Sequence, residues 1–101
     1  MSARPAAKVA EVVPGQAKVV TLGDVRVALC NVDGKIYAIE DVCTHDDGPL
    51  GEGALAVGRI QCPRHGAQFD VKTGSAVRMP AIVPVRTFPV EVKDGEIFVR
   101  V

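Results

Sequence analysis

Hydrophobic and polar residues alternate in short runs along most of this chain, and turn-forming residues separate the runs. In residues 25–32, the side chains of Val25, Val27 and Leu29 fall on one face of an extended strand. Other short β-branched runs predict strands at residues 8–12, 18–22, 35–40, 55–57, 59–61, 68–71, 75–78, 85–93 and 96–101. No run keeps a helical period over about ten residues, so the pattern predicts an all-β fold.

Pairs of turn residues predict how these strands connect. Asp33-Gly34 and Asp94-Gly95 each lie between two adjacent runs, which is typical of a tight antiparallel hairpin. Pro14-Gly15 and Gly23-Asp24 mark two further turns near the N-terminus. The strands before residue 41 are therefore expected to form an antiparallel meander that supports the segment after it.

That following segment carries the candidate chemistry. Cys43 and His45 form a C-x-H pair, and Cys62 and His65 form a C-x-x-H pair after the intervening residues 46–61. Thiolate and imidazole are good ligands for soft or borderline metals, and the glycines after each pair allow tight loops. A tetrahedral zinc ion fits such a set, as does a [2Fe–2S] cluster with two Cys on one iron and two His on the other. One Cys and one His in each half favours the cluster, while a Cys43–Cys62 disulfide is a third interpretation.

Composition narrows the class of protein. The chain has 101 residues, expected as a single domain 1–101, and its 12 basic and 12 acidic residues give no net charge. Nothing therefore indicates nucleic acid or an anionic membrane as a partner, and no apolar run is long enough to span a bilayer. The first residues, MSARPAAKVAEV, lack the apolar centre of a signal peptide, so we expect a cytoplasmic protein. In that compartment cysteines favour metal binding over disulfides, and the third, Cys30, is expected to be a small core residue.

The two pairs and their flanking residues resemble a known family. The segments CTHDDGPLGEG and CPRHGAQFD are similar to the two cluster-binding boxes of Rieske-type iron–sulfur proteins. Along nearly its full length the chain resembles the Rieske-type ferredoxins of multicomponent oxygenase systems. The resemblance implies an all-β Rieske-type iron–sulfur fold: antiparallel sheets in a sandwich, with a small cluster-binding subdomain at about residues 41–79. It also implies one [2Fe–2S] cluster per chain, with Cys43 and Cys62 on the buried iron and His45 and His65 on the exposed iron.

The same resemblance implies an electron carrier that performs no substrate chemistry. Such a protein takes one electron from a flavin-dependent NAD(P)H reductase to a terminal Rieske non-haem iron oxygenase that acts on aromatic rings. The only two histidines belong to the motif, so no 2-His-1-carboxylate iron site can be read in the chain. A monomer is expected. The alternatives are a Rieske small subunit of a nitrite reductase, a component of another redox or iron–sulfur assembly system, and a zinc-binding structural module.

Departures from the respiratory members of the family predict the redox potential. Those proteins carry an extra Cys in each box, joined as a disulfide, at the positions of Gly48 and Arg64 here. They also place Ser and Tyr hydroxyls near the cluster, where this chain has Ala67 and Phe69. Fewer hydrogen-bond donors stabilise the reduced cluster less, so we expect the low end of the Rieske range, on the order of −150 mV.

Two charged positions beside the ligands have open roles. Arg64 is either a solvated charge or a residue that docks a partner. Asp46 and Asp47 either form a hydrated turn or steer a basic partner surface. Pro80 resembles the proline loop that covers the cluster in the family, and its other interpretation is an ordinary proline at a strand end.

Overall fold

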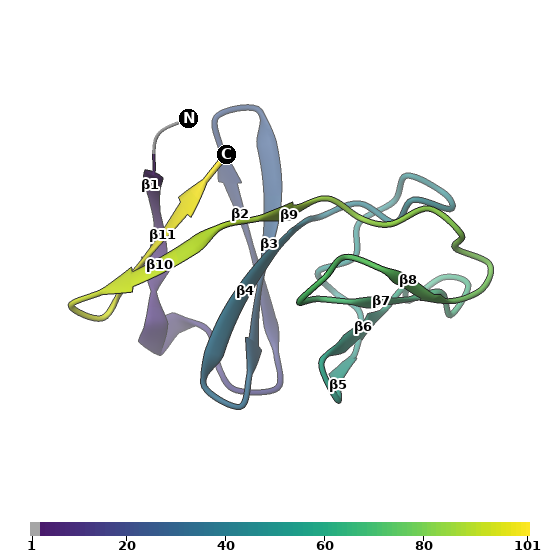
Figure 1. Ribbon diagram of the computed structural model, residues 1–101, viewed down its shortest axis with the longest axis horizontal. Helices are drawn as coiled ribbons and strands as arrows, with labels where there is room; N and C mark the ends of the chain where they lie inside the picture. Colours follow the sequence, from purple (N-terminus) through teal and green to yellow (C-terminus); the bar gives the residue numbers. More distant parts are fainter. Residues whose placement is uncertain (1–2) are drawn as a thin grey trace.

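The computed structural model describes residues 3–101, which form three antiparallel sheets arranged along the long axis of the molecule (Figure 1). The first sheet has the order β1-β11-β10, with β1 at Ala3–Lys8, β11 at Glu96–Arg100 and β10 at Val90–Lys93. The second has the order β2-β3-β4-β9, with strands at Ala17–Leu22, Val25–Val32, Lys35–Glu40 and Thr87–Phe88. The third runs β5-β6-β7-β8, with strands at Leu55–Ala56, Arg59–Gln61, Gln68–Asp70 and Ala76–Arg78. The all-β prediction is confirmed.

Two strand predictions differ from the structure by more than one residue at an end. The first strand ends at Lys8, and Val9–Glu11 forms a 3₁₀ turn in which the backbone N–H of Lys8 donates to Glu11 Oε1 at 2.8 Å. This local hydrogen bond competes with continued pairing in the sheet. The predicted strand at residues 85–93 is split at Pro89, which has no N–H to donate to a ladder. The chain leaves the second sheet at this proline and enters the first.

The Asp-Gly hairpins are confirmed. Asp33 and Gly34 both have positive φ, at 53° and 91°, and Asp94 and Gly95 have φ of 53° and 76°. Positive φ at both central residues matches the twist of the flanking strands in a tight hairpin, and Asp and Gly tolerate that conformation.

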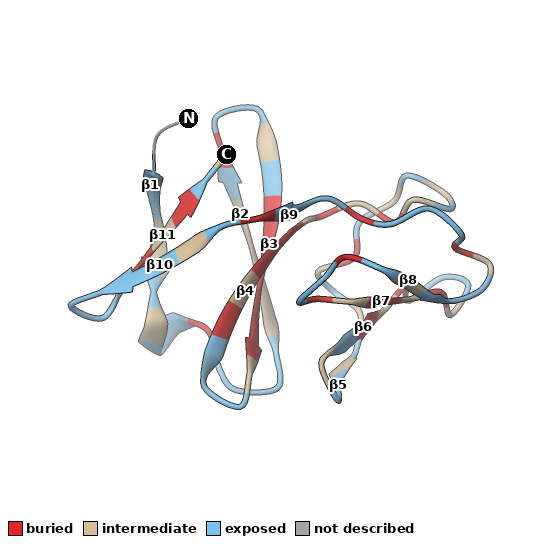
Figure 2. Ribbon diagram, in the orientation of Figure 1, coloured by how far each residue is buried: buried red, intermediate tan, exposed pale blue. Residues whose placement is uncertain are grey.

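Strand β3 is buried on both faces and separates two hydrophobic cores. Val27 and Leu29 pack between the first and second sheets with Ile97 and Val99 of β11. Ala28 and Cys30 point the other way, toward the third sheet. Figure 2 shows this central sheet as the most continuously buried part of the molecule. The predicted shared face of Val25, Val27 and Leu29 is therefore confirmed, and the opposite face of the strand forms a second core.

The third sheet and both cysteine loops fall within residues 41–79, the segment predicted as the cluster-binding insert. The division of the chain into one domain with such an insert stays a prediction. Within residues 3–101, no helix has the length and apolar character needed to cross a membrane.

Cys30 is fully buried in β3, as predicted, and this burial gives the fold a pH dependence. Burial, followed by the nearby charge of Asp41, raises the pKa of the Cys30 thiol from 9.0 to about 12. The folded chain therefore keeps a proton that the unfolded chain loses above about pH 9. This contribution to stability is complete below pH 9 and is lost as the pH rises toward 12.

We expect wild-type protein to lose stability relative to Cys30→Ala by up to about 3 kcal/mol between pH 8 and pH 11. The substitution also costs a constant amount from lost packing, so only the change with pH is informative. Urea unfolding of both proteins at several pH values measures it. Parallel curves across this range would contradict the assignment.

Candidate metal centre

The first cysteine loop follows β4 and is closed by two backbone hydrogen bonds. The N–H of Cys43 donates to the carbonyl of Gly48 at 2.7 Å, and the N–H of Asp47 donates to the carbonyl of Cys43 at 2.7 Å. Asp47 has a left-handed conformation, with φ of 61°, which Asp adopts more readily than most residues. The turn exposes His45 and directs Cys43 inward.

The second loop, between β6 and β7, repeats these two bonds at the same spacing. The N–H of Cys62 donates to the carbonyl of Ala67 at 2.7 Å, and the N–H of Gly66 donates to the carbonyl of Cys62 at 3.1 Å. Gly66 is four residues after its cysteine, as Asp47 is, and it too has a left-handed φ, of 76°. The two segments therefore fold into the same turn although only the Cys matches position by position, the His being two residues after Cys43 and three after Cys62.

The structure brings the four predicted ligands together as two chemically distinct pairs. Cys43 and Cys62 are fully buried, and their sulfurs lie within 4.8 Å of each other and of a carboxylate oxygen of Asp46. His45 and His65 are exposed, with ring centroids 5.2 Å apart and planes at 86°. All three cysteines are free, so the disulfide interpretation is not supported.

This arrangement fits a [2Fe–2S] group that needs different ligands on its two irons. The thiols form the inner pair and the imidazoles the outer pair, which is the donor set of a Rieske centre. Burial raises the pKa of the Cys43 thiol. Because a thiol binds a metal as the thiolate, loading the site releases protons.

Asp41, which sequence reasoning passed over, holds the glycine-rich part of the first loop. Its side chain is buried, and Oδ1 accepts hydrogen bonds from the backbone N–H of Leu50 at 2.8 Å and of Gly51 at 2.6 Å. Oδ2 lies 2.9 Å from Nη2 of Arg26 on β3. An acidic residue at the end of a strand, before a loop rich in glycine, was the available sequence indication of this role.

Asp46 and Arg64 form an ion pair between the two loops. Oδ2 of Asp46 accepts from Nε of Arg64 at 2.6 Å, and Oδ1 accepts from Nη2 at 3.0 Å. The hydrogen bonds from Arg64, and then the N–H of Gly48, lower the pKa of the Asp46 carboxyl, and Asp46 raises the pKa of Arg64. The negative charge of Asp46 and the positive charge of Arg64 therefore neutralise each other within the chain. A role of Arg64 or Asp46 in docking a partner stays a prediction.

The buried sulfurs rest on an apolar core from several segments. The core residues around the cysteines are Leu50, Ile60, Ala67, Phe69, Val71, Ala81 and Val85. At Gly53 the loop passes against β6, and a Cβ there would overlap the carbonyl oxygen of Gln61. Only glycine allows this close approach, which brings the end of the first loop against the strand that leads to Cys62.

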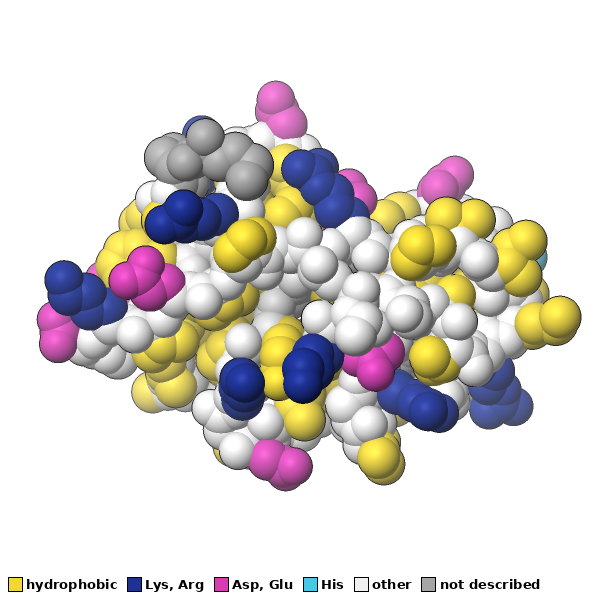
Figure 3. Space-filling view, viewed as in Figure 1, with side chains coloured by type: hydrophobic (Ala, Val, Ile, Leu, Met, Phe, Trp, Pro, Cys, Tyr) yellow, Lys and Arg dark blue, Asp and Glu magenta, His cyan; other side chains and the backbone are white. Residues whose placement is uncertain are grey.

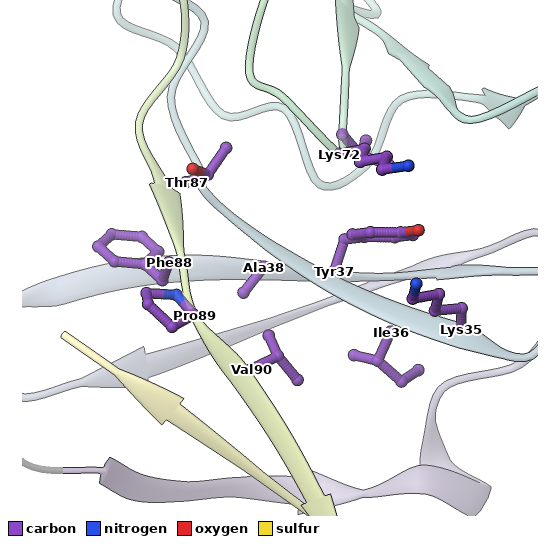
Figure 4. Close-up of a pocket in the computed structure, with 10 residues that line it drawn as sticks. Lys35, Ile36, Tyr37, Ala38, Lys72, Thr87, Phe88, Pro89 and Val90 are labelled. Atoms are coloured by element: carbon purple, nitrogen blue, oxygen red, sulfur yellow. The ribbon is translucent and has the colours of Figure 1, made fainter.

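A shallow recess of about 500 Å³ lies where the third sheet meets the other two (Figure 4). Lys35 and Tyr37 of β4 line one side, Phe88 of β9 another, and Lys72 projects toward it from the turn after β7. Both lysines are exposed, with Lys35 Nζ 5.7 Å from the centre of the Tyr37 ring. The recess lies at the boundary between the sheets. Its lining contains no cysteine or histidine, so it offers no metal ligands like those of the two loops.

Comparison with known proteins agrees with this geometry. A family model described as the Rieske [2Fe-2S] domain matches residues 2–89. The chain is 42% identical to the 3-phenylpropionate/cinnamic acid dioxygenase ferredoxin subunit of Escherichia coli K12, over 93% of this chain and 89% of that protein.

Two solved structures are also similar. The ferredoxin of carbazole 1,9a-dioxygenase from Nocardioides aromaticivorans IC177 has a TM-score of 0.93 and 29% identity, over 98% of this chain and 97% of that one. A chain in the complex of reduced oxygenase and oxidized ferredoxin in carbazole 1,9a-dioxygenase has a TM-score of 0.90 and 38% identity, over 96% of this chain and 91% of that one. With a buried cysteine pair beneath an exposed histidine pair, and with these relatives, the chain belongs to the Rieske [2Fe–2S] family.

Proposed function

We propose that this protein is the electron-carrying ferredoxin of an aromatic-ring dioxygenase system. It accepts one electron from a flavin-dependent NAD(P)H reductase and delivers it to a terminal Rieske non-haem iron oxygenase. The observation that carries the proposal is the exposed pair His45 and His65 above the buried cysteines. The 42% identity to a dioxygenase ferredoxin subunit supports it, since that relative covers nearly the whole chain.

In this proposal Cys43 and Cys62 hold the inner iron, and His45 and His65 hold the outer iron. When bound, the cluster supplies a one-electron carrier. The chain's own residues do the rest: the apolar core keeps water from the thiolates, and the exposed imidazoles lie where a partner can approach. Neutral imidazoles in place of two thiolates also lower the negative charge, which raises the potential above that of an all-cysteine cluster.

An apolar rim beside the first loop supports a protein partner at this end. Met79, Ile82 and Val83 are exposed by 73%, 80% and 53%, large values for such side chains. Thr44 donates to the carbonyl of Val83 at 2.6 Å, which ties this segment to the loop of Cys43 and His45. Figure 3 shows hydrophobic side chains gathered at the end of the molecule beyond β8, with an imidazole at its edge. Apolar surface that a partner can cover favours docking here.

The setting of the protein is part of the same proposal. We infer a monomer in the cytoplasm, as expected of a small shuttle that meets two partners in turn. Sedimentation or size-exclusion measurements test the monomer, and fractionation of cells tests the location.

A visible and EPR spectrum with a redox titration tests the proposed function first. We expect a coloured protein with a rhombic EPR signal after reduction by dithionite, and a potential on the order of −150 mV. NADH with a flavin-dependent reductase should reduce the protein, and a terminal oxygenase should reoxidise it. A colourless protein that contains zinc, or a reduced protein that no oxygenase reoxidises, would contradict the proposal.

The potential should rise in Ala67→Ser. Ala67 is buried beside Cys62, at the position where respiratory relatives place a hydroxyl, so a serine there offers the cluster a donor. A hydrogen bond stronger by about 1–2 kcal/mol in the reduced state raises the potential by roughly 40–90 mV. Ala56→Ser, on the exposed strand β5, is the matched control and should leave the potential unchanged. Equal potentials in the two variants would show that the residue at position 67 does not influence the redox potential of the cluster.

A further inference from the structure

Arg64 links the two cysteine loops directly. It belongs to the second loop, but its guanidinium reaches the first, where Nε and Nη2 donate to the two oxygens of Asp46 at 2.6 and 3.0 Å. Its Nη1 donates to the carbonyl of Pro49 at 2.9 Å. A planar guanidinium with three such bonds fixes distance and orientation together, which a point charge does not.

The backbone of the first loop is shaped to receive this side chain. A Cβ added at Gly48 would lie 2.5 Å from Cζ of Arg64 and 2.6 Å from its Nη2. The guanidinium therefore lies against Gly48, in space that any larger residue would occupy. Asp46, Gly48 and Pro49 surround it from one loop, and Arg64 alone comes from the other.

The ion pair lies beside the proposed ligands. A carboxylate oxygen of Asp46 is within 4.8 Å of the sulfurs of Cys43 and Cys62, and Oδ2 is 3.5 Å from Nδ1 of His65. The side chains of Arg64 and Asp46 are only 33% and 19% exposed, so their charges are partly shielded from water. A charge left unpaired here would act on the metal centre more strongly than one on an open surface.

We propose that Arg64 is a positioning residue that clamps the two loops and, with Asp46, sets the charge beside the cluster. The clamp keeps the four ligands aligned, and the paired charges keep that side of the site electrically neutral. This inference rests on the proposed function, because it requires the cluster to lie between the two loops. It assigns Arg64 and Asp46 a role within the chain, in place of docking a partner.

The two parts of the role make different predictions. Arg64→Lys keeps the positive charge but removes the planar guanidinium and its three hydrogen bonds. The cluster should therefore be lost faster, at an unchanged potential. Arg64→Gln leaves Asp46 negative beside a group that gains an electron, so the potential should also fall. Asp46→Asn leaves Arg64 positive, so the potential should rise. The double variant Asp46→Asn/Arg64→Gln removes both charges, and its potential should return to the wild-type value while the cluster is still lost faster.

The experiment uses purified protein that carries its cluster. Loss of visible absorbance in excess iron chelator measures retention of the cluster, and a redox titration measures the potential. We expect Arg64→Lys and Arg64→Gln to lose the cluster roughly 10-fold faster, a typical effect of residues that orient metal ligands. Gly48→Ala, which displaces the guanidinium without straining the backbone, should resemble Arg64→Lys. Arg78→Gln removes an exposed arginine from β8 and is the matched control.

Two results would overturn the clamp. If all Arg64 variants keep cluster and potential as wild type does, and only electron transfer to an oxygenase slows, Arg64 is a docking residue. If the potentials of the Arg64→Gln and Asp46→Asn variants shift in the same direction, the paired-charge argument fails. Failure of the proposed function has another signature, because it would show in the wild-type protein, which would then carry no reducible cluster or pass no electron to an oxygenase.

Discussion

Replacing Cys62 by alanine is expected to remove the [2Fe–2S] cluster completely. The two sulfurs of Cys43 and Cys62 form the buried inner pair, and the chain offers no other cysteine within 4.8 Å of them among residues 3–101. Loss of one thiolate leaves an iron with an open position against an apolar core. Cys62→Ala and Cys43→Ala should therefore show no visible band, no EPR signal after reduction, and a loss of about two iron atoms per chain.

The third cysteine is the matched control for this result. Cys30 is equally buried but points into the core from β3, where it has no ligand role in the proposal. Cys30→Ala should keep the full iron content and spectrum. If Cys30→Ala loses the cluster and Cys62→Ala retains it, the assignment of the inner pair is wrong.

The outer pair has its own variant. His45→Cys keeps a ligand at the exposed iron but exchanges a neutral imidazole for a thiolate, so the visible spectrum should change and the potential should fall. An unchanged spectrum would mean that His45 is not a ligand. The same reasoning applies to His65, whose ring lies 5.2 Å from that of His45.

Replacing Asp41 by alanine is expected to cost about 3 kcal/mol and to disorder the first loop. The substitution leaves the buried N–H of Leu50 and the partly buried N–H of Gly51 without their acceptor, and it opens a gap beneath the loop. Because this loop presents Cys43 and His45, the cluster should bleach at a lower urea concentration. The midpoint of bleaching, followed in the visible band, measures the effect.

Two milder variants separate the hydrogen bonds that Asp41 makes to the loop from its ion pair with Arg26. Asp41→Asn keeps an oxygen that can accept from both N–H groups, so most of the stability should remain. Arg26→Gln removes the ion-pair partner, whose side chain is 58% exposed, and should cost under about 1 kcal/mol. If Arg26→Gln lowers stability as much as Asp41→Ala does, the ion pair stabilises this region, and the hydrogen bonds from Asp41 to the N–H groups of the loop do not.

The class of fold and the candidate ligands can be predicted from local pattern. Period-two alternation in residues 25–32 predicts a strand, and Asp33-Gly34 predicts its hairpin, because both depend on neighbours in the chain. The spacing of Cys43, His45, Cys62 and His65 is equally local within each loop. The family resemblance carried by those residues agrees with the matches to Rieske proteins.

The local pattern did not set the strand bounds correctly in two places. The run at residues 85–93 reads as one strand, yet Pro89 divides it between two sheets, since β10 pairs with β11 while β9 pairs with β4. The run at residues 8–12 is apolar enough for a strand, but a side-chain cap from Glu11 ends the ladder at Lys8. At Pro89 the outcome depends on which strands lie alongside in space, whereas at Lys8 it depends on a local hydrogen bond that the strand pattern does not show.

The same division holds at the metal centre. The residue types needed to bind a cluster are legible in the chain, because metal chemistry restricts them to thiolate and imidazole at short spacing. The buried cysteines and exposed histidines agree with what the family resemblance implied. The tertiary structure alone decided that Asp41 caps a loop nine residues away and that Arg64 pairs with Asp46 across 18 residues. Burial and ion pairing are properties of neighbours in space, and two loops on different strands become neighbours only when the sheets have packed.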